Sequence, residues 1–371
     1  MRIAVLSAAN SVHTVRWVSA LAERGHQVAL YSLPDHPASI GAVPGNAEVH
    51  YLSRGGVAGY WLGSGELRRR LREFRPDLLN AHYATGYGTL ARRCGFRPLL
   101  LSVWGSDVYD FPRQGVINRK ILMKNLADAT AIASTSFAMA RQVRRIYPAA
   151  GEIFVTPFGV DADVFRPVGK PCAGRLTIGI VKTLEPKYGV EDLIRAFALL
   201  CERLTREERL PEKGISLEIY GGGSLRGGLE NLSRRLAPGL VQFHGPAPHA
   251  EVPKILSGFD LFCAPSVSDS ESFGVAAVEA MACGIPVVVS DVDGFQEVVV
   301  DGVTGLVVPR KNPEALADGM YRLACDSGLR ERFGRAGREH VLKNYAWPGC
   351  VDKMETALRA TVERYGRPLP F

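Results

Sequence analysis

Short apolar runs alternate with longer amphipathic stretches along the whole chain. The runs are rich in Val, Ile, Leu and Ala, which predicts buried strands, whereas the stretches between them have helical period. This alternation is typical of parallel sheets covered by helices. In the first half, the predicted strands are 3–6, 28–31, 78–81, 99–103, 131–133 and 153–156.

The pattern restarts after a polar, turn-rich stretch at 165–175. We therefore expect two doubly wound α/β domains, 1–168 and 169–345, facing across a cleft that binds the ligands, and a last helix at 346–371 that crosses back to the first domain. The segment 33–60 is rich in Pro and Gly and is predicted to be a long irregular connection. The predicted strands of the second half are 176–181, 217–220, 241–244, 260–264 and 287–289; its predicted helices include 190–203, 225–236, 249–258, 312–327 and 329–345.

Composition indicates the class of protein and its cellular compartment. With 371 residues, 46% hydrophobic and 22% charged, the chain has the composition of a globular protein. Its apolar runs are shorter than the roughly 18 residues of a membrane-spanning helix. The seven cysteines are scattered without a C-x-x-C pair, which favours a reducing compartment and no metal site. We expect a cytoplasmic protein.

The excess of positive over negative charge is confined to the first half. Residues 1–168 hold 20 Lys and Arg against 12 Asp and Glu, a net charge of +8, whereas the remainder has a net charge of −1. The densest basic cluster is LRRRLREFR at 67–75. The excess is either a solubilising surface or an attraction to an anionic partner, such as the inner face of a membrane. A nucleic acid is not expected, because no nucleic-acid-binding motif accompanies the charge.

The stretch 264–289, APSVSDSESFGVAAVEAMACGIPVVV, holds the clearest candidate chemistry. Glu271 lies in its loop, and Glu279 lies in the small-residue helix that follows. If the helix begins near Gly274, its first N–H groups and the positive end of its dipole face the same loop as Glu271. The stretch therefore predicts a diphosphate site beside a carboxylate that accepts hydrogen bonds from hydroxyls.

Residues 176–310 resemble the nucleotide-binding domain of glycosyltransferase family 4, which has the GT-B fold of two Rossmann-like domains. The first half agrees more loosely. The resemblance implies a retaining glycosyltransferase that moves a sugar from a UDP- or GDP-sugar to a hydroxyl acceptor, without a cofactor or a metal ion. The motifs that carry it are GIVKTLEPKYGVEDLIRAF, LFCAPS, ESFGVAAVE, EAMACGIPVVVSDVDGFQEVV and DGVTGLVVP.

The resemblance implies a role for each residue of this stretch. Glu271 would contact hydroxyls of the donor sugar, and Glu279 would hold the ribose hydroxyls, although a helix-surface role for Glu279 stays open. Backbone N–H groups at the start of the helix would bind the diphosphate. The residues of that loop are Ser272, Phe273, Gly274 and Val275.

Two lysines stand where the family has an Arg and a Lys. Lys182 and Lys187 would stabilise the charge that develops on the leaving diphosphate. Lys182 replaces the commoner Arg and supplies a point charge without a bidentate fork. Gly222 and Gly223 resemble the family's turn beside the base and phosphates. Solvated lysines and a simple tight turn are the alternative interpretations.

The first half departs from the family pattern after a strand. Many relatives have His-Gly-x-Asp there, whereas this chain has Trp104-Gly105-Ser106-Asp107. Either the His contact is lost or another residue supplies it, with His82 the first candidate and Asp107 the second. A structural role for His82 and plain packing for Trp104 stay open.

The first turn lacks the paired glycines of the family. The diphosphate would have to be contacted there by Asn10 and Ser11, or by the start of the following helix, and His13 is expected to face the acceptor. The opening Ser-x-His-Thr-x-Arg-Trp and the Trp-Gly-Ser-Asp run look like the subset that builds bacterial surface polysaccharides. The acceptor is then a lipid-linked glycan or polysaccharide precursor. Two alternatives remain: a UDP-sugar epimerase of the same fold, and a degenerate protein that only binds a nucleotide sugar.

Overall fold

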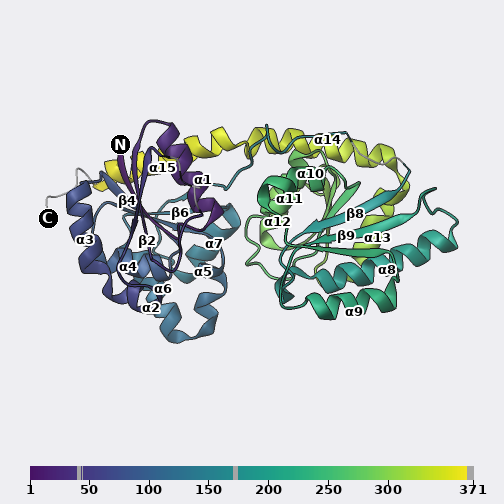
Figure 1. Ribbon diagram of the computed structural model, residues 1–371, viewed down its shortest axis with the longest axis horizontal. Coiled ribbons are helices and arrows are strands. Elements are labelled where there is room, and N and C mark those ends of the chain that lie inside the picture. The colour runs from purple at the N-terminus through teal and green to yellow at the C-terminus, as the bar shows by residue number, and fades with distance from the viewer. Residues whose placement is uncertain (40–42, 44, 170–173, 366–371) are drawn as a thin grey trace. The chain divides into compact units, whose positions relative to one another are not determined.

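The computed structural model describes residues 1–39, 43, 45–169 and 174–365, and it divides into two compact units (Figure 1). Unit 1 comprises Met1–Phe158 together with the chain from Pro348 onward, and unit 2 comprises Gly159–Trp347. The division falls before the predicted boundary at 168. The physical reason is that Val160 pairs with Ala346 and that buried Phe165 accepts a hydrogen bond from Arg338 on its carbonyl (3.1 Å), both within unit 2.

Unit 1 is built on a parallel sheet of seven strands among the described residues, in the order β3-β2-β1-β4-β5-β6-β7. Its central strands are buried along their whole length, as the apolar runs predicted. The strands are β1 (Arg2–Leu6), β2 (Gln27–Ser32), β3 (Ala47–Tyr51), β4 (Leu78–His82), β5 (Leu99–Val103), β6 (Ala131–Ser134) and β7 (Ile153–Val155).

The helices of unit 1 connect these strands and cover the sheet. Several ends follow from local chemistry: Ser136 accepts a hydrogen bond from Met139 N–H at the start of α7, and Gly95 adopts a left-handed conformation after α4. The helices are α1 (Val12–Glu23), α2 (Gly56–Leu62), α3 (Ser64–Phe74), α4 (Gly86–Cys94), α5 (Ser106–Tyr109), the 3₁₀ turn η1 (Phe111–Gln114), α6 (Val116–Asp128), α7 (Phe137–Ile146) and α15 (Trp347–Tyr365).

One prediction for unit 1 was wrong. The segment 33–60 contains the edge strand β3 and the helix α2 in place of one irregular connection. β3 pairs only with β2 among the described residues, and none of its five residues is fully buried, so its sequence lacks a continuous apolar run.

The last helix, α15, packs within unit 1. Its buried face includes Met354 and Leu358. Glu355 on this helix accepts a hydrogen bond from Arg24 (2.8 Å) and pairs with His26 Nε2 (2.6 Å), which ties the helix to the end of α1 and the start of β2.

Unit 2 repeats the architecture with six parallel strands among the described residues, in the order β10-β9-β8-β11-β12-β13. Its first strand, β8, therefore lies beside the fourth, β11, so the loops that follow these two strands meet at the carboxyl edge of the sheet. The strands are β8 (Leu176–Val181), β9 (Ile215–Tyr220), β10 (Val241–Gly245), β11 (Leu261–Ala264), β12 (Val287–Ser290) and β13 (Gly305–Val308).

The helices of unit 2 largely follow the predicted periods. Asn312 and Asp326 cap two of them by accepting hydrogen bonds from the N–H groups of Ala315 and Leu329. The elements are η2 (Pro186–Tyr188), α8 (Val190–Arg206), α9 (Arg226–Leu236), η3 (His249–Glu251), α10 (Val252–Leu256), α11 (Val275–Ala282), α12 (Asp293–Val298), α13 (Pro313–Cys325) and α14 (Ser327–Asn344). Among the described residues, the helices are too short or too polar to cross a membrane.

Candidate functional site

The loop between β11 and α11 carries Glu271 at the carboxyl edge of the second sheet. Two glycines allow other elements to approach its backbone. A Cβ on Gly189 would lie 2.1 Å from the carbonyl oxygen of Pro265, and one on Gly294 would lie 2.3 Å from that of Glu271. Only residues without a side chain fit at these points, so the loop is held by backbone packing. Gly294 belongs to the DGFQEVV motif, whose structural task the sequence did not reveal.

Gly274 ends this loop and caps α11, as predicted. Its left-handed conformation (φ 82°) and the Phe295 ring packed against it both require glycine. The first N–H groups of α11 lack carbonyl partners within the helix and face the loop, which suits an anion. Ser272 and Phe273 are buried just before it, and Val275 is partly exposed. Predicted contacts of these residues with a diphosphate stay predictions.

Lys182 and Glu271 form an ion pair at the meeting point of the two strands. Lys182 Nζ lies 2.5 Å from Glu271 Oε2, and the side chains are 21% and 9% exposed. Burial by itself lowers the pKa of Lys182, but the Glu271 carboxylate, together with Tyr188 and Glu279, more than offsets this, so the pKa stands above its usual value. The lysine is therefore a charged group throughout the neutral range, beside the first turn of α11.

Lys187 lies in η2, which, like Lys182, follows β8 at the carboxyl edge of the sheet. The ammonium groups of Lys182 and Lys187 lie 4.4 and 5.0 Å from the centre of the Tyr188 ring. The face of an aromatic ring attracts a cation, so Tyr188 holds both lysines near one place. The sequence named the two lysines but not the tyrosine that brings them together.

Glu279, the second predicted carboxylate, is buried in α11 and has a partner that the sequence reasoning missed. His249 Nε2 lies 2.9 Å from Glu279 Oε1, and the His249 side chain is about half exposed. A vicinal diol that binds Glu279 has to share this carboxylate with His249. His249 precedes Glu279 by 30 residues and lies in the turn η3, so no spacing rule linked them.

The glycine-rich turn after β9 has a packing role. A Cβ on Gly223 would lie 2.4 Å from the Leu184 carbonyl oxygen, and one on Gly221 would lie 1.9 Å from that of Lys182. Gly222 accepts a hydrogen bond from Leu184 N–H (2.9 Å). The turn thus lets the loop that carries Lys182 pack against β9, which supports the tight-turn interpretation; contact of Gly222 and Gly223 with phosphates stays a prediction.

An Asp-x-Asp pair, Asp291 and Asp293, follows β12 and raises the question of a metal ion. Asp291 Oδ1 accepts hydrogen bonds from Arg310 Nε (2.8 Å) and Arg310 N–H (3.0 Å), and the same guanidinium binds Asp269. Asp291 is therefore already paired with a cation. Among the described residues, no group of three or more His, Cys, Asp or Glu side chains could hold a metal ion.

A pocket of about 230 Å³ lies within unit 1 at the carboxyl ends of β1 and β4. Tyr83, in the left-handed region at φ 71°, is strained there, and strained residues cluster at functional sites. Its hydroxyl lies 3.0 Å from Ser106 Oγ. The lining is aromatic and hydroxyl-rich: Ser7, Ala8, Ser11, His36, Tyr60, His82, Tyr83, Thr85, Gly86, Tyr87 and Trp104.

His82 is the most deeply buried ionisable group of this pocket. Its Nε2 lies 2.8 Å from Asn80 Oδ1, and the Asn80 amide donates to Leu100 and Ser102, so Asn80 presents an acceptor and His82 donates. Burial lowers the pKa of His82 to about 3, with a smaller effect from His13. His82 is therefore neutral, and its buried Nδ1 lone pair has no hydrogen-bond partner among the described residues.

Trp104, which replaces the family's His, packs against His82 with ring centres 4.5 Å apart. Asp107 is buried beneath it and accepts hydrogen bonds from the backbone N–H groups of Ala84 (2.9 Å), Trp104 (3.1 Å) and Gly105 (2.8 Å). These contacts hold the loops after β4 and β5 together. They give Asp107 a structural task, and its contact with a substrate stays a prediction.

The residues of the first turn surround the start of α1. Ser11 caps this helix and lines the pocket, and Asn10 is exposed. The His13 ring stacks on Phe158 at 3.8 Å and meets Trp104 edge-on at 5.9 Å. His13 is thus part of an aromatic cluster next to the pocket, whereas its contact with an acceptor stays a prediction.

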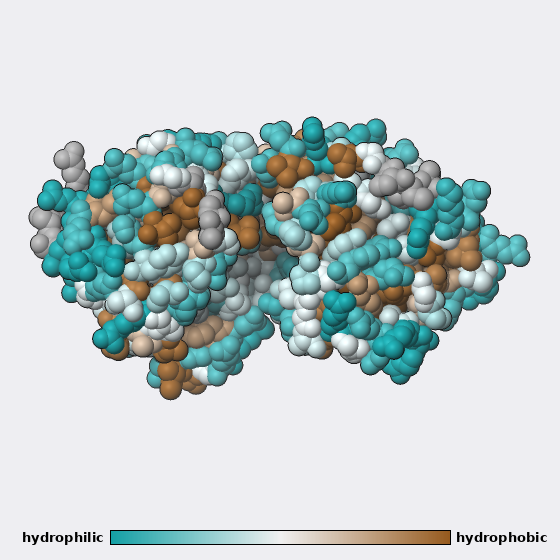
Figure 2. Space-filling view, in the orientation of Figure 1, coloured by the Kyte–Doolittle hydropathy of each residue, from teal (hydrophilic) through white to brown (hydrophobic). Residues whose placement is uncertain are grey.

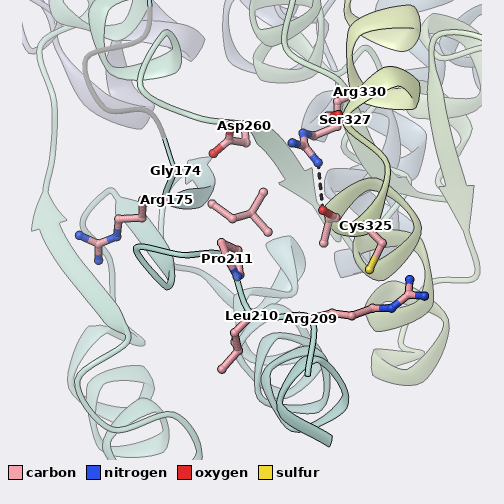
Figure 3. A pocket seen from close by; sticks show the side chains of 11 residues that line it. Gly174, Arg175, Arg209, Leu210, Pro211, Asp260, Cys325, Ser327 and Arg330 are labelled. Atoms are coloured by element: carbon pink, nitrogen blue, oxygen red, sulfur yellow. Dashed lines mark hydrogen bonds between the residues drawn. The ribbon is translucent and has the colours of Figure 1, made fainter. Parts of the chain in front are cut away.

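A second hollow, of about 640 Å³, lies within unit 2 at the amino ends of β8 and β11 (Figure 3). Arg175 points away from it, and Arg330 donates a hydrogen bond to the Ala324 carbonyl (3.0 Å). Parallel sheets bind ligands at their carboxyl ends, so this hollow lies at the wrong edge for the substrate.

Comparison with known proteins agrees with this geometry. The family model "Glycosyl transferases group 1" matches residues 163–340, and "Glycosyl transferase 4-like" matches residues 2–136. Phosphatidyl-myo-inositol mannosyltransferase of Mycobacterium leprae is 30% identical over 360 residues, which cover 90% of this chain and 88% of that protein. The chain belongs to the glycosyl transferases group 1 family.

The expected family and its GT-B fold, two parallel-sheet α/β domains, are thereby confirmed. Anabaena HepE in complex with UDP and glucose has the same fold, with a TM-score of 0.77 and 17% identity, and the match covers 97% of this chain and 100% of that one. D-inositol 3-phosphate glycosyltransferase of Kribbella flavida is 34% identical over 232 residues, 58% of this chain. The chain spans about half the length of that relative (52%).

Proposed function

We propose that the protein transfers a sugar from a nucleoside diphosphate sugar to a hydroxyl acceptor, with retention of configuration and without a metal ion. One observation carries the proposal: Lys182, Glu271 and the start of α11 converge at the carboxyl ends of β8 and β11. A cation and a helix N-terminus suit a diphosphate, and the adjacent carboxylate suits sugar hydroxyls. Membership of the family supports the same reaction class.

Each residue has a distinct task in this proposal. Lys182 and Lys187 stabilise the charge that grows on the leaving diphosphate, which is commonly the largest single contribution to catalysis. Glu271 orients the donor sugar and Glu279 the ribose. The acceptor oxygen bonds to the anomeric carbon as the carbon–oxygen bond to the diphosphate breaks, and the departing phosphate takes the acceptor's proton.

The acceptor is proposed to be a hydroxyl-rich, lipid-linked molecule that enters the pocket of unit 1. The aromatic faces of Tyr83 and Trp104 suit a sugar-like ring, and the His82 Nδ1 lone pair suits a hydroxyl donor. The names of two relatives, a phosphatidyl-myo-inositol mannosyltransferase and a D-inositol 3-phosphate glycosyltransferase, point to polyol acceptors that carry phosphate. A lipid-linked acceptor of this kind would place the protein at the inner face of a membrane.

Incubation with UDP- and GDP-sugars, with and without a panel of lipid-linked acceptors, tests the proposal. Glu271→Ala and Lys187→Ala are expected to lower transfer at least about 100-fold and to leave the fold intact. Lys213→Ala, an exposed lysine at the amino edge of the sheet, is the matched control and retains activity. Wild-type rates in either site variant would overturn the assignment.

The same incubations separate the alternatives. A changed sugar nucleotide without any acceptor identifies an epimerase, and tight donor binding without turnover on any acceptor identifies a binding protein. A thermal-shift series with nucleoside diphosphates gives the base, because a ligand that binds only the folded protein raises its stability with concentration.

A further inference from the structure

One face of unit 1 combines exposed apolar side chains with unpaired positive charge. It is formed by η1 and α6, and we call it the η1–α6 face. Val116 and Ile117 at the start of α6 are 70% and 74% exposed, among the highest values for large apolar residues. Figure 2 shows hydrophobic surface at the lower edge of the unit, where Figure 1 labels α2 and α6. The exposed residues of the face are Arg113, Gln114, Gly115, Val116, Ile117, Arg119, Lys120, Met123, Lys124 and Ala127.

Helical geometry explains why these side chains share one face. Lys120, Met123 and Lys124 follow Val116 by four, seven and eight positions, which places them along one side of a helix. Leu122, with Asn125 and Leu126, lies on the opposite, buried side. The outward side therefore cannot be covered by the core of its own domain.

The charges of the η1–α6 face are uncompensated. The segment 111–127 contains four basic residues and no Asp or Glu. Among the described residues, no carboxylate forms an ion pair with Arg113, Arg119, Lys120 or Lys124. These cations are free to meet an external anion.

The basic cluster that the sequence singled out differs from this face. In α3, Arg69 pairs with Glu73 (3.1 Å), and Arg70 pairs with Glu66 (2.8 Å). Arg68 donates a hydrogen bond to the Cys94 carbonyl (2.9 Å). Much of the positive charge of α3 is thus used within the protein, and α3 has no exposed large apolar residue.

The position of the η1–α6 face connects it to the pocket of unit 1. The chain leaves β5 at Val103, lines the pocket with Trp104, and then forms α5, η1 and the start of α6. A helix between two parallel strands begins at the carboxyl edge of the sheet, which is the edge where the pocket lies. A lipid-linked acceptor in the pocket would thus have its lipid near Val116 and Ile117.

We propose that the η1–α6 face docks on an anionic lipid bilayer. Val116 and Ile117 enter the boundary between headgroups and acyl chains, while Arg119, Lys120 and Lys124 meet lipid phosphates. The inference rests on the proposed function for its biological purpose, since a lipid-linked acceptor requires access to the membrane. The binding itself needs no donor or acceptor and is testable alone.

Flotation with vesicles of phosphatidylglycerol and phosphatidylcholine, compared with vesicles of phosphatidylcholine alone, tests the proposal at low and physiological salt. The full chain is expected to float with the anionic vesicles at both salt concentrations, and to bind more weakly at physiological salt because the charges are screened. Lys120→Glu/Lys124→Glu should weaken binding at least about 20-fold, since each cation contributes about fivefold near a charged surface. Val116→Ser/Ile117→Ser should weaken binding at both salt concentrations.

Two control variants make the same kinds of substitution outside the η1–α6 face. Arg69→Glu/Arg72→Glu makes the same change of charge on α3, and Val300→Ser/Val303→Ser removes exposed apolar residues from unit 2. Both should bind anionic vesicles within about threefold of the unaltered protein, as the docking face is intact. Equal losses in the α3 variant, or no loss in the Lys120 and Lys124 variant, would overturn the assignment of the face.

The stabilisation of each variant by UDP or GDP keeps the two proposals separate. Retained nucleotide stabilisation with failed vesicle binding by the unaltered protein rejects the membrane face alone. Vesicle binding by the unaltered protein without nucleotide stabilisation rejects the proposed function alone.

Discussion

The ion pair between Lys182 and Glu271 offers the sharpest test of the candidate site. We consider Lys182→Met, Glu271→Gln and the double variant, because each replacement keeps the approximate shape and removes one charge. At 2.5 Å, in surroundings with an effective dielectric constant near 20, two unit charges attract by about 7 kcal/mol. Removing both ions from water costs several kcal/mol each, so only a small part of this attraction stabilises the fold.

The expected loss of unfolding free energy follows from how exposed Lys182 and Glu271 are. Removing one partner of a fully buried pair costs about 3–5 kcal/mol. Lys182 keeps 21% of its side-chain exposure, so each single variant is expected to lose about 2–3 kcal/mol of unfolding free energy. The double variant leaves no buried charge unpaired and should lose about as much as one single variant, which corresponds to a coupling energy of about 2 kcal/mol.

Urea unfolding of the four proteins at neutral pH measures this coupling. Additivity of the two single effects within about 0.5 kcal/mol would refute the reasoning, since it would mean that the two charges do not interact in solution.

Binding of UDP or GDP gives a second, independent test of the ion pair between Lys182 and Glu271. Glu271→Gln removes a negative charge beside the diphosphate site and frees Lys182 for the ligand. We therefore expect this variant to bind the nucleoside diphosphate several-fold more tightly while it transfers sugar more slowly. Lys182→Met should weaken both. Weaker nucleotide binding by Glu271→Gln than by the unaltered protein would contradict the placement of the two residues.

Three further predictions concern the scaffold. The pKa of His82 is about 3 in the folded protein and near 6.5 in the unfolded chain, so the unfolded chain takes up a proton first as the pH falls. The contribution of neutral His82 to the unfolding free energy is fully present above pH 6.5 and falls by about 1.4 kcal/mol per pH unit towards pH 3. His82→Gln should flatten this slope when urea unfolding is measured at a series of pH values. Gly294→Ala places a Cβ 2.3 Å from the Glu271 carbonyl oxygen and should lower stability by about 1–3 kcal/mol and weaken nucleotide stabilisation, whereas Gly228→Ala, which meets open space, should do neither. Asp107→Asn replaces one of the two acceptor oxygens by an NH2 donor, so at least one of the three backbone N–H groups loses its acceptor, and the urea midpoint at pH 7 should fall by the equivalent of about 1–3 kcal/mol. An unchanged midpoint would show that the lost bond contributes nothing.

Sequence reasoning succeeded where signals were local. Most strands of both sheets contain enough apolar residues to be recognised, although β13 was not predicted, and the start of α11 at Gly274 followed from helix chemistry. It failed at β3, whose exposed residues carry no alternating pattern at the edge of the sheet.

Contacts that depend on the order of the strands in the sheet could not be predicted from the sequence. Lys182 and Glu271 were both named, yet their ion pair exists because β11 lies beside β8, with two other strands between them in the chain. The pairing of His249 with Glu279 has the same origin, since it joins a turn to a helix across the intervening β11. The unpaired Nδ1 of His82 likewise reflects the packing around it and not its neighbours in the chain.

The return of α15 to unit 1 sets an order for folding during synthesis. Residues 1–158 leave the ribosome before unit 2 does. Their apolar surface is covered by Met354 and Leu358, and Arg24 and His26 pair with Glu355, only once α15 has been made. Unit 2 is one continuous stretch of the chain and can fold on its own before α15 is made. Unit 1 thus begins to emerge before unit 2 and is finished after it, so a nascent chain exposes apolar surface of unit 1 until translation reaches α15.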